Sequence, residues 1–249
     1  MTVFVATLEQ TGFLFLFILM GYFLAGKKLV PDNSQAVLSK LENYIFIPAL
    51  VLGTFIENFT PEKITVAAVY ATCHDLKPGI VCINGTGSNC SFFNGKEVEQ
   101  AVNSLGYLAM DDCSGVDFGR RLIRAYYFNT MPSDLKIKFE AAYNLNADYI
   151  KQNFYKEPNP NAYLASFLPF LIANKQHIFL QEMIADSFQF FVDHYIKQYP
   201  NHQQVPIHFI GSTAFLLQDE FKSILEKNNL IAGVFYQKPL EGLMERHQK

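Results

Sequence analysis

The first 26 residues of the chain contain a single charged side chain, Glu9. The segment Gly12 to Ala25 is almost entirely apolar, and Val3 to Leu8 extends it toward the N-terminus. Because about 20 apolar residues cross a bilayer as a helix, the sequence predicts a membrane helix over about 3–25. A signal peptide fits less well, since no Lys or Arg precedes the apolar run. The alternative is a buried core helix.

A second apolar segment covers about 36–58, and Pro48 interrupts it. Lys27, Lys28 and Lys40 flank the connecting loop, and the positive-inside tendency places such a loop in the cytoplasm. The sequence therefore predicts a membrane location with the lipid bilayer as a partner. If only the first helix spans, the rest of the chain is cytoplasmic; if both span, the rest of the chain lies on the other side of the membrane.

The character of the sequence changes after about residue 66, where apolar runs shorten and turn residues become frequent. We therefore expect two domains, a hydrophobic helical segment over 1–66 and an α/β domain over 67–249, because short strands alternate there with long helices. Strands are predicted at 79–84, 92–98 (with a hairpin at Asn94-Gly95), 205–210 and 234–237. Helices are predicted at 117–128, 133–143, 161–177, 179–199 and 214–228.

Composition excludes several classes of protein. Apolar residues make up 50% of the chain and charged residues 17%, which excludes intrinsic disorder. The formal net charge of −3 gives no reason to expect a nucleic-acid partner. The four cysteines, at 73, 82, 90 and 113, form no CxxC pair and no His stands at zinc-ligand spacing. We expect no metal site on these residues and four free, buried thiols.

The segment GTGSN at 85–89 directly follows a predicted strand. Glycines let a backbone approach an anion, while Thr86, Ser88 and the loop amides can donate to it, so the segment is a candidate phosphate loop. A plain strand-ending turn is the alternative.

Two further strand or loop junctions could carry chemistry. Asp111 and Asp112 precede a predicted helix, where they could bind a sugar hydroxyl, or a magnesium ion through water. Taken alone, the pair is better explained as a solvated helix start, since the helix dipole favours acidic residues there. The segment 208–214 is a strand–glycine–helix junction that could present amides to a nucleotide.

The order of these three junctions resembles one family. PGIVCINGTGSNCSFFNGK (78–96), SLGYLAMDDCSGVDFGRRL (104–122) and VPIHFIGSTAF (205–215) look like the C-terminal half of a BadF/BadG/BcrA/BcrD ATPase-type sugar kinase. The N-acetylglucosamine kinase-like members of the actin/hexokinase superfamily are the most similar. The resemblance implies a ribonuclease H-like lobe and a cleft that holds ATP, magnesium and the sugar. The implied phosphate- and sugar-binding residues are Gly85, Thr86, Gly87, Ser88, Asp111 and Ser114, and the implied nucleotide-binding residues are Gly211, Ser212 and Ala214.

The chain also departs from the family pattern. Where the family has G-D-E-G-S-G, residues 110–115 read MDDCSG, so two glycines and the Glu are replaced. The position of the family's catalytic Asp falls near Ile64, whose side chain cannot accept a proton. Residues 1–66 show no first phosphate loop. We therefore assign no catalytic residue and expect little or no phosphotransfer by this chain alone.

Residues 12–55 resemble something else, the first two helices of an auxin efflux carrier-type permease. The sequence interpretation is thus a sugar-kinase-like lobe joined to a permease-like membrane segment. A membrane-tethered module that binds nucleotide or amino sugar without turnover is one alternative, and a transporter fragment is another. A lobe with an open cleft would also expose apolar surface, which favours self-association.

Overall fold

The structure is a computed structural model that describes residues 77–239 and, before them, the isolated positions 22, 23, 27, 40, 44 and 73. The chain divides into two compact units, Met1–Thr60 and Pro61–Lys249. The continuous described stretch belongs to the second unit. The predicted helices over 3–25 and 36–58, and the predicted permease-like segment, lie outside the described residues apart from those isolated positions.

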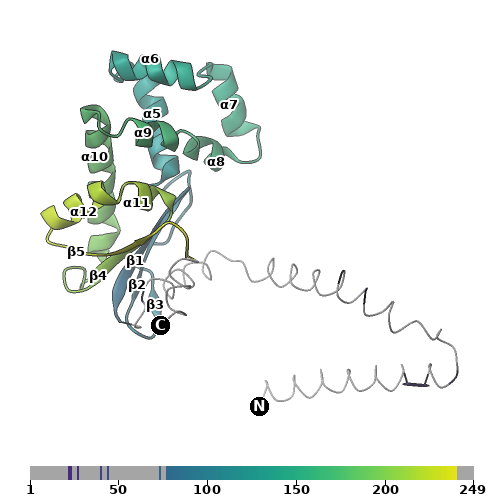
Figure 1. The fold of residues 1–249 in the computed structure, drawn as a ribbon, viewed down its shortest axis with the longest axis vertical. Coiled ribbons are helices and arrows are strands. Elements are labelled where there is room, and N and C mark those ends of the chain that lie inside the picture. The colour runs from purple at the N-terminus through teal and green to yellow at the C-terminus, as the bar shows by residue number, and fades with distance from the viewer. Residues whose placement is uncertain are drawn as a thin grey trace. The chain divides into compact units, whose positions relative to one another are not determined.

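A mixed five-stranded sheet forms the centre of the second unit (Figure 1). The strands are β1 (Gly79–Asn84), β2 (Ser88–Phe93), β3 (Val98–Glu99), β4 (Pro206–Ile210) and β5 (Ile231–Tyr236), in the spatial order β3-β2-β1-β4-β5. β1 pairs antiparallel with β2 and parallel with β4, and β5 continues the parallel side. The predicted α/β class is confirmed.

The central position of β1 follows from its sequence. GIVCIN is buried along nearly its whole length, as expected for a strand covered on both faces. β5 lies at an edge, and its first two residues are exposed. The strand ends that lead to the candidate motifs therefore belong to the buried middle of the sheet, where packing fixes them.

Eight α-helices accompany this sheet within residues 77–239. α10 (Ile178–His194), α11 (Ser212–Leu216) and α12 (Gln218–Lys227) lie beside the sheet, whereas α6 and α7 lie farther from it (Figure 1). The others are α5 (Gly115–Tyr127), α6 (Ser133–Ala142), α7 (Ala147–Tyr155), α8 (Pro160–Ala165) and α9 (Leu168–Ala173), and a 3-10 turn covers Ile196–Gln198.

Phenylalanine fills much of the core between the sheet and its helices. The rings of Phe188 in α10 and Phe221 in α12 are stacked with centroids 3.8 Å apart. Phe209 of β4 meets both rings edge-on, and all three side chains are fully buried. Such offset and edge-on aromatic contacts add to the free energy gained by burial.

Several helix predictions need correction. The single helix predicted at 161–177 is two short helices, α8 and α9, and Pro169 lies in the first turn of the second. A proline lacks the amide proton that an uninterrupted helix would need there, so a new helix begins instead. The helix predicted at 214–228 is likewise divided at Leu217, and α7 was not predicted.

The predicted membrane location is wrong for the part of the chain that the structure describes. No helix among those residues is both long enough and apolar enough to cross a bilayer. The most apolar long helix among them, α10, buries Leu180, Ile184, Phe188, Phe191 and Val192 in the core.

The prediction that the cysteines are buried is confirmed for all four, Cys73, Cys82, Cys90 and Cys113. Cys82 and Cys90 face each other across β1 and β2 with their Sγ atoms 3.6 Å apart. Burial raises the pKa of the Cys82 thiol, an effect to which its hydrogen bond with Cys90 contributes.

Candidate functional site

The three junctions predicted from the sequence meet at one backbone atom, the carbonyl oxygen of Gly85. The hydroxyl of Thr213, at the start of α11, donates to it at 2.8 Å. The amide of Gly115, at the start of α5, also donates to it at 2.8 Å. The amide of Val116 donates to the next carbonyl, that of Thr86, at 3.0 Å. The β1–β2 turn is therefore held from two sides by the starts of two helices.

A pocket of about 460 Å³ opens beside this meeting point. The turn and the starts of α5 and α11 form its polar end, and apolar side chains of α8, α9 and α11 form an apolar wall. The polar end comprises Gly85, Thr86, Gly115, Ser212 and Thr213, and the apolar wall comprises Ala165, Leu168, Pro169, Ile172, Ala173 and Leu216. The side chains of Thr86 and Ser212 are exposed.

Asp111 lies against the other side of the same turn. The amide of Ser88 donates to Oδ1 of Asp111 at 3.1 Å. A Cβ atom placed on Gly87 would lie 2.7 Å from Oδ2 of Asp111, so only glycine lets the carboxylate approach the turn this closely. The predicted residues Gly87, Ser88 and Asp111 thus form one contact group.

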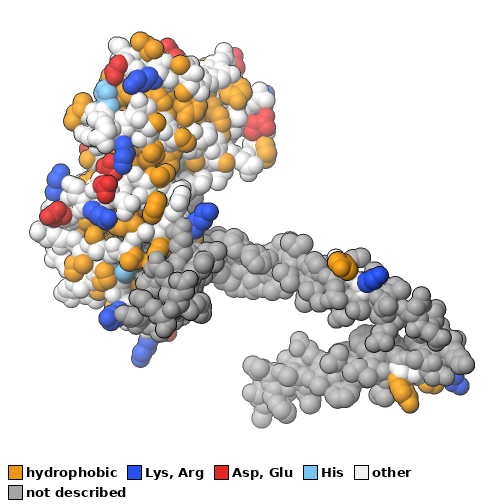
Figure 2. Space-filling model, viewed as in Figure 1, with side chains coloured by type: hydrophobic (Ala, Val, Ile, Leu, Met, Phe, Trp, Pro, Cys, Tyr) orange, Lys and Arg blue, Asp and Glu red, His pale blue; other side chains and the backbone are white. Residues whose placement is uncertain are grey.

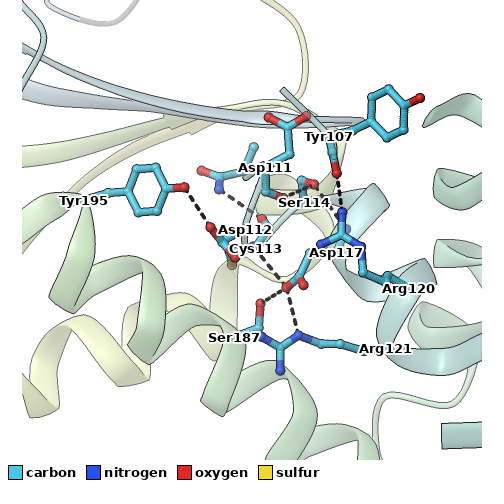
Figure 3. A network of polar contacts seen from close by, with 11 residues as sticks. Tyr107, Asp111, Asp112, Cys113, Ser114, Asp117, Arg120, Arg121, Ser187 and Tyr195 are labelled. Carbon is cyan, nitrogen blue, oxygen red and sulfur yellow. Dashed lines mark hydrogen bonds and ion pairs between the residues drawn. The ribbon is translucent and has the colours of Figure 1, made fainter. Parts of the chain in front are cut away.

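Partial burial raises the pKa of Asp111 above its ordinary value. The amide of Ser88 and the guanidinium of Arg120 act in the opposite direction, and the neighbouring carboxylate of Asp112 adds to the increase. The two carboxylates point to different sides of their turn (Figure 3). Asp112 accepts a hydrogen bond from the Tyr195 hydroxyl at 2.7 Å, and burial together with this contact raises the pKa of Tyr195.

The backbone of the acidic turn is unusual at two positions. Asp111 has φ 65° and Cys113 has φ 57°, both in the left-handed region that glycine adopts most easily. Position 113 is one of the two at which a glycine of the resembled motif is replaced. The chain therefore keeps the glycine-like backbone conformation at this position although it carries a cysteine there.

The remaining predicted residues have packing roles in the structure. Ser114 is buried, accepts from the Asp117 amide as the N-cap of α5, and donates to the Asp111 carbonyl at 2.6 Å. Ala214 is fully buried in the core. Gly211 has φ 124°, and a Cβ atom there would lie 2.4 Å from the Asn84 carbonyl oxygen. Of the three predicted nucleotide-binding residues, only Ser212 lines the pocket.

Sequence reasoning missed two groups of residues. One is the apolar wall on α8 and α9, which the sequence cannot distinguish from ordinary core helix. The other is a polar network beneath the acidic turn that includes Asp117, Arg121, Ser187 and Tyr195 (Figure 3). Asp117 is visible in the sequence as an acidic residue in the first turn of a helix, but its partner Ser187 is 70 residues away.

Apolar side chains are gathered on the surface over α5 to α9 (Figure 2). Leu105, Leu108 and Tyr155 are each more than two-thirds exposed, and Leu216 at the pocket wall is 40% exposed. The self-association expected from an apolar cleft face stays a prediction. Within residues 77–239 and the isolated described positions, no group of three or more His, Cys, Asp or Glu side chains could hold a metal ion.

Comparison with known proteins agrees with this fold. No protein-family model and no curated protein matches the chain. The chain is similar to the solved structure of a "putative N-acetylglucosamine kinase" from Porphyromonas gingivalis, with 36% identity and a TM-score of 0.68. A second such structure, from Chromobacterium violaceum, has 17% identity and a TM-score of 0.51, which supports the fold alone.

These matches cover about three quarters of the chain, 73% and 72%, but only 63% and 64% of the two kinase structures. Neither protein is a permease, so the resemblance of residues 1–66 to auxin efflux carriers and the membrane-fusion reading receive no support. The described residues form a mixed α/β lobe like that of N-acetylglucosamine kinases of the actin/hexokinase type.

Proposed function

We propose that this ribonuclease H-like lobe binds ATP in the pocket beside Gly85 and presents Asp111 to an amino sugar. The observation that carries the proposal is the meeting of three distant segments at the Gly85 carbonyl, with residues of each lining one pocket. The names of the two similar structures support the choice of N-acetylglucosamine as the sugar.

The pocket suits a nucleotide because its two ends differ in chemistry. The exposed hydroxyls of Thr86 and Ser212 and the backbone of the glycine turn can donate to phosphate oxygens. The apolar wall of α8 and α9 can cover a purine, and a volume of about 460 Å³ lies in the usual range for small-molecule sites. Magnesium usually binds through the nucleotide phosphates and water with one or two carboxylates, so it would arrive with ATP.

Asp111 is the best-placed acceptor for sugar hydroxyls in the described residues. It is half-buried and held against the turn by Ser88 and Gly87, so its carboxylate has a fixed direction. Asp112 is less suited to that role, because its Oδ2 already accepts from Tyr195. The sugar would therefore lie next to Asp111, on the side of the turn away from Tyr195.

We further propose that the chain transfers phosphate slowly or not at all. By the resemblance, the position of the family's catalytic Asp falls near Ile64, which lies outside the described residues. The chain also corresponds to only 63% of the similar kinase's length, so that protein's activity does not carry over directly. A binding module without turnover is the second candidate function. It is favoured by the same observation, that an aliphatic residue, Ile64, lies near the position of the family's catalytic Asp.

Calorimetry on the whole chain with ATP and Mg²⁺ tests the binding proposal. Ala173, exposed on the pocket wall, can be replaced by Trp without entering the core. Ala173→Trp should lower ATP affinity at least about tenfold, which is a loss of about 1.4 kcal/mol. Ala141→Trp, at an exposed α6 position outside the pocket lining, is the matched control and should bind like the wild type.

Two results would contradict the proposal. The wild type could show no heat of binding at millimolar ATP, or Ala173→Trp could bind as tightly as Ala141→Trp. Phosphate release measured with and without N-acetylglucosamine separates the two candidate functions, since a sugar-dependent rate would show that turnover survives.

A further inference from the structure

Asp117 is a buried carboxylate on which three donors converge. Its side chain is 5% exposed. Its Oδ2 atom accepts from the Ser187 hydroxyl at 2.6 Å, from Arg121 Nε at 2.9 Å and from the Cys113 amide at 3.2 Å (Figure 3). The donors come from α10, from the next turn of α5 and from the acidic turn, so one oxygen joins three parts of the fold.

A buried charge is expensive unless it is paired and hydrogen-bonded, and an apolar side chain would often serve the core as well. An apolar residue could accept none of these three hydrogen bonds, and the one that reaches the acidic turn comes from the Cys113 amide. That turn has two residues in the left-handed region, Asp111 and Cys113. Such conformations cost about 1–3 kcal/mol each and persist only when the surroundings hold them.

The held backbone determines where the Asp111 carboxylate lies. Ser114 fixes the Asp111 carbonyl, and Asp117 fixes the Cys113 amide, so the turn is clamped on its C-terminal side. Tyr195, which follows α10, holds the Asp112 carboxylate of the same turn. With these contacts in place, the Asp111 carboxylate reaches the Ser88 amide and lies against Gly87.

We propose that Asp117 is a positioning residue for the sugar site, which acts through Cys113 to hold Asp111 against the β1–β2 turn. The inference rests on the proposed function in one respect, the assignment of Asp111 to the sugar. Its structural part, the coupling of Asp117 to the Asp111–Ser88 contact, can be tested without any ligand.

The test uses Asp117→Asn and Ser187→Ala in the whole chain. Ser187→Ala removes one donor from Asp117 while the carboxylate keeps its charge, so its effect cannot arise from a change in charge. The matched control is Asp148→Asn. Like Asp117, Asp148 lies in the first turn of its helix and pairs with a basic side chain of the same helix, but it is exposed on α7.

The first readout is the amide signal of Ser88 in NMR spectra of the folded proteins. We expect it to shift and to exchange faster with solvent in both variants, more in Asp117→Asn than in Ser187→Ala, and to be unchanged in Asp148→Asn. The second readout is calorimetry, with sugar affinity expected to fall about tenfold in Asp117→Asn and ATP affinity unchanged. A general loss of stability would not lower the sugar affinity while leaving the ATP affinity unchanged.

The proposal would be overturned by a Ser88 amide that keeps its signal in both variants while they remain folded. If Asp117→Asn does not fold, Ser187→Ala alone decides the question. A wild-type protein that binds no N-acetylglucosamine would refute the proposed function, whereas the Ser88 readout would still decide whether Asp117 positions Asp111.

Discussion

The hydroxyl of Thr213 donates to the carbonyl oxygen of Gly85 at 2.8 Å, although 128 residues separate them. The bond ties the start of α11, after β4, to the turn after β1, and these two strands are parallel neighbours in the sheet. The carboxyl ends of both strands therefore meet at one edge, where open α/β sheets commonly bind ligands. The pocket beside Gly85 is a direct result of this pairing.

Removing that hydroxyl should weaken the site. Thr213→Val keeps the shape of the buried side chain but leaves the Gly85 carbonyl with one donor fewer, and we expect a loss of about 1–2 kcal/mol in unfolding free energy. Urea denaturation measures it. Thr130→Val, at an exposed threonine that bonds only locally to the Ala125 carbonyl, should change stability by less than about 0.5 kcal/mol. Equal losses in both variants would contradict this prediction.

The two glycines of the turn should affect different ligands. Gly87→Ala places a methyl group 2.7 Å from the Asp111 carboxylate and must displace it, so sugar affinity should fall about tenfold or more. A Cβ atom at position 85, in the pocket lining, would meet no atom within 4 Å. Gly85→Ala should therefore lower the affinity for ATP more than the affinity for the sugar. Calorimetry with each ligand measures both. The prediction fails if either variant weakens both ligands equally.

Asp111→Asn should stabilise the protein at neutral pH while it weakens sugar binding. Because burial raises the pKa of Asp111 in the folded state, the native protein binds more protons than the unfolded chain above the ordinary aspartate pKa, about 3.9. Stability of the wild type therefore falls as pH rises from that value through the raised pKa of the folded protein, and then stays level. Asn has no such titration, and it also tolerates the left-handed backbone.

Unfolding free energies of the wild type and Asp111→Asn across pH 3 to 7 check this prediction. The two proteins should be nearly equal in stability at pH 3, and the variant should gain its advantage as pH rises above about 4. A variant that is less stable than the wild type at pH 7 would show that the ionised carboxylate stabilises the turn instead.

Gly119 should not accept any side chain. A Cβ atom at this position in α5 would lie 1.9 Å from the Leu164 carbonyl oxygen of α8, a distance that neither backbone can relieve locally. A glycine inside a helix normally gains about 1 kcal/mol on replacement by alanine. Here we expect Gly119→Ala to lower the unfolding free energy by about 1–3 kcal/mol or more, because α5 and α8 must separate. Thermal unfolding decides the sign, with the exposed Glu182→Ala in α10 as control.

Local sequence patterns predicted the elements whose signals are contained within a few residues. β1, α5, α6 and β4 were found within about three residues at each end, because their apolar spacing and turn residues lie in the segment itself. The split of residues 161–177 was missed although Pro169 is visible, since the apolar pattern continues across the break. The helix α7 was also missed, and only one of its side chains, Ile150, is buried.

The prediction of a membrane location rests mainly on hydrophobicity. Hydropathy reports how much apolar surface a segment offers but not whether lipid or protein covers it. α10 illustrates the ambiguity within the described residues, since Leu180, Ile184, Phe188 and Phe191 form an apolar stripe that is buried under the sheet and α12. No helix in that part of the chain could span a bilayer.

The sequence by itself determined the α/β class, the three loop motifs and the glycines that they require, because these depend on backbone conformations specified by adjacent residues. Only the tertiary structure decided that the motifs share the Gly85 carbonyl, that Ser114 and Ala214 serve packing, and that Asp117 reaches Ser187 across 70 residues. Those contacts depend on strand order and helix packing. Both are set by the way the whole lobe buries its apolar residues, and no local sequence pattern specifies them.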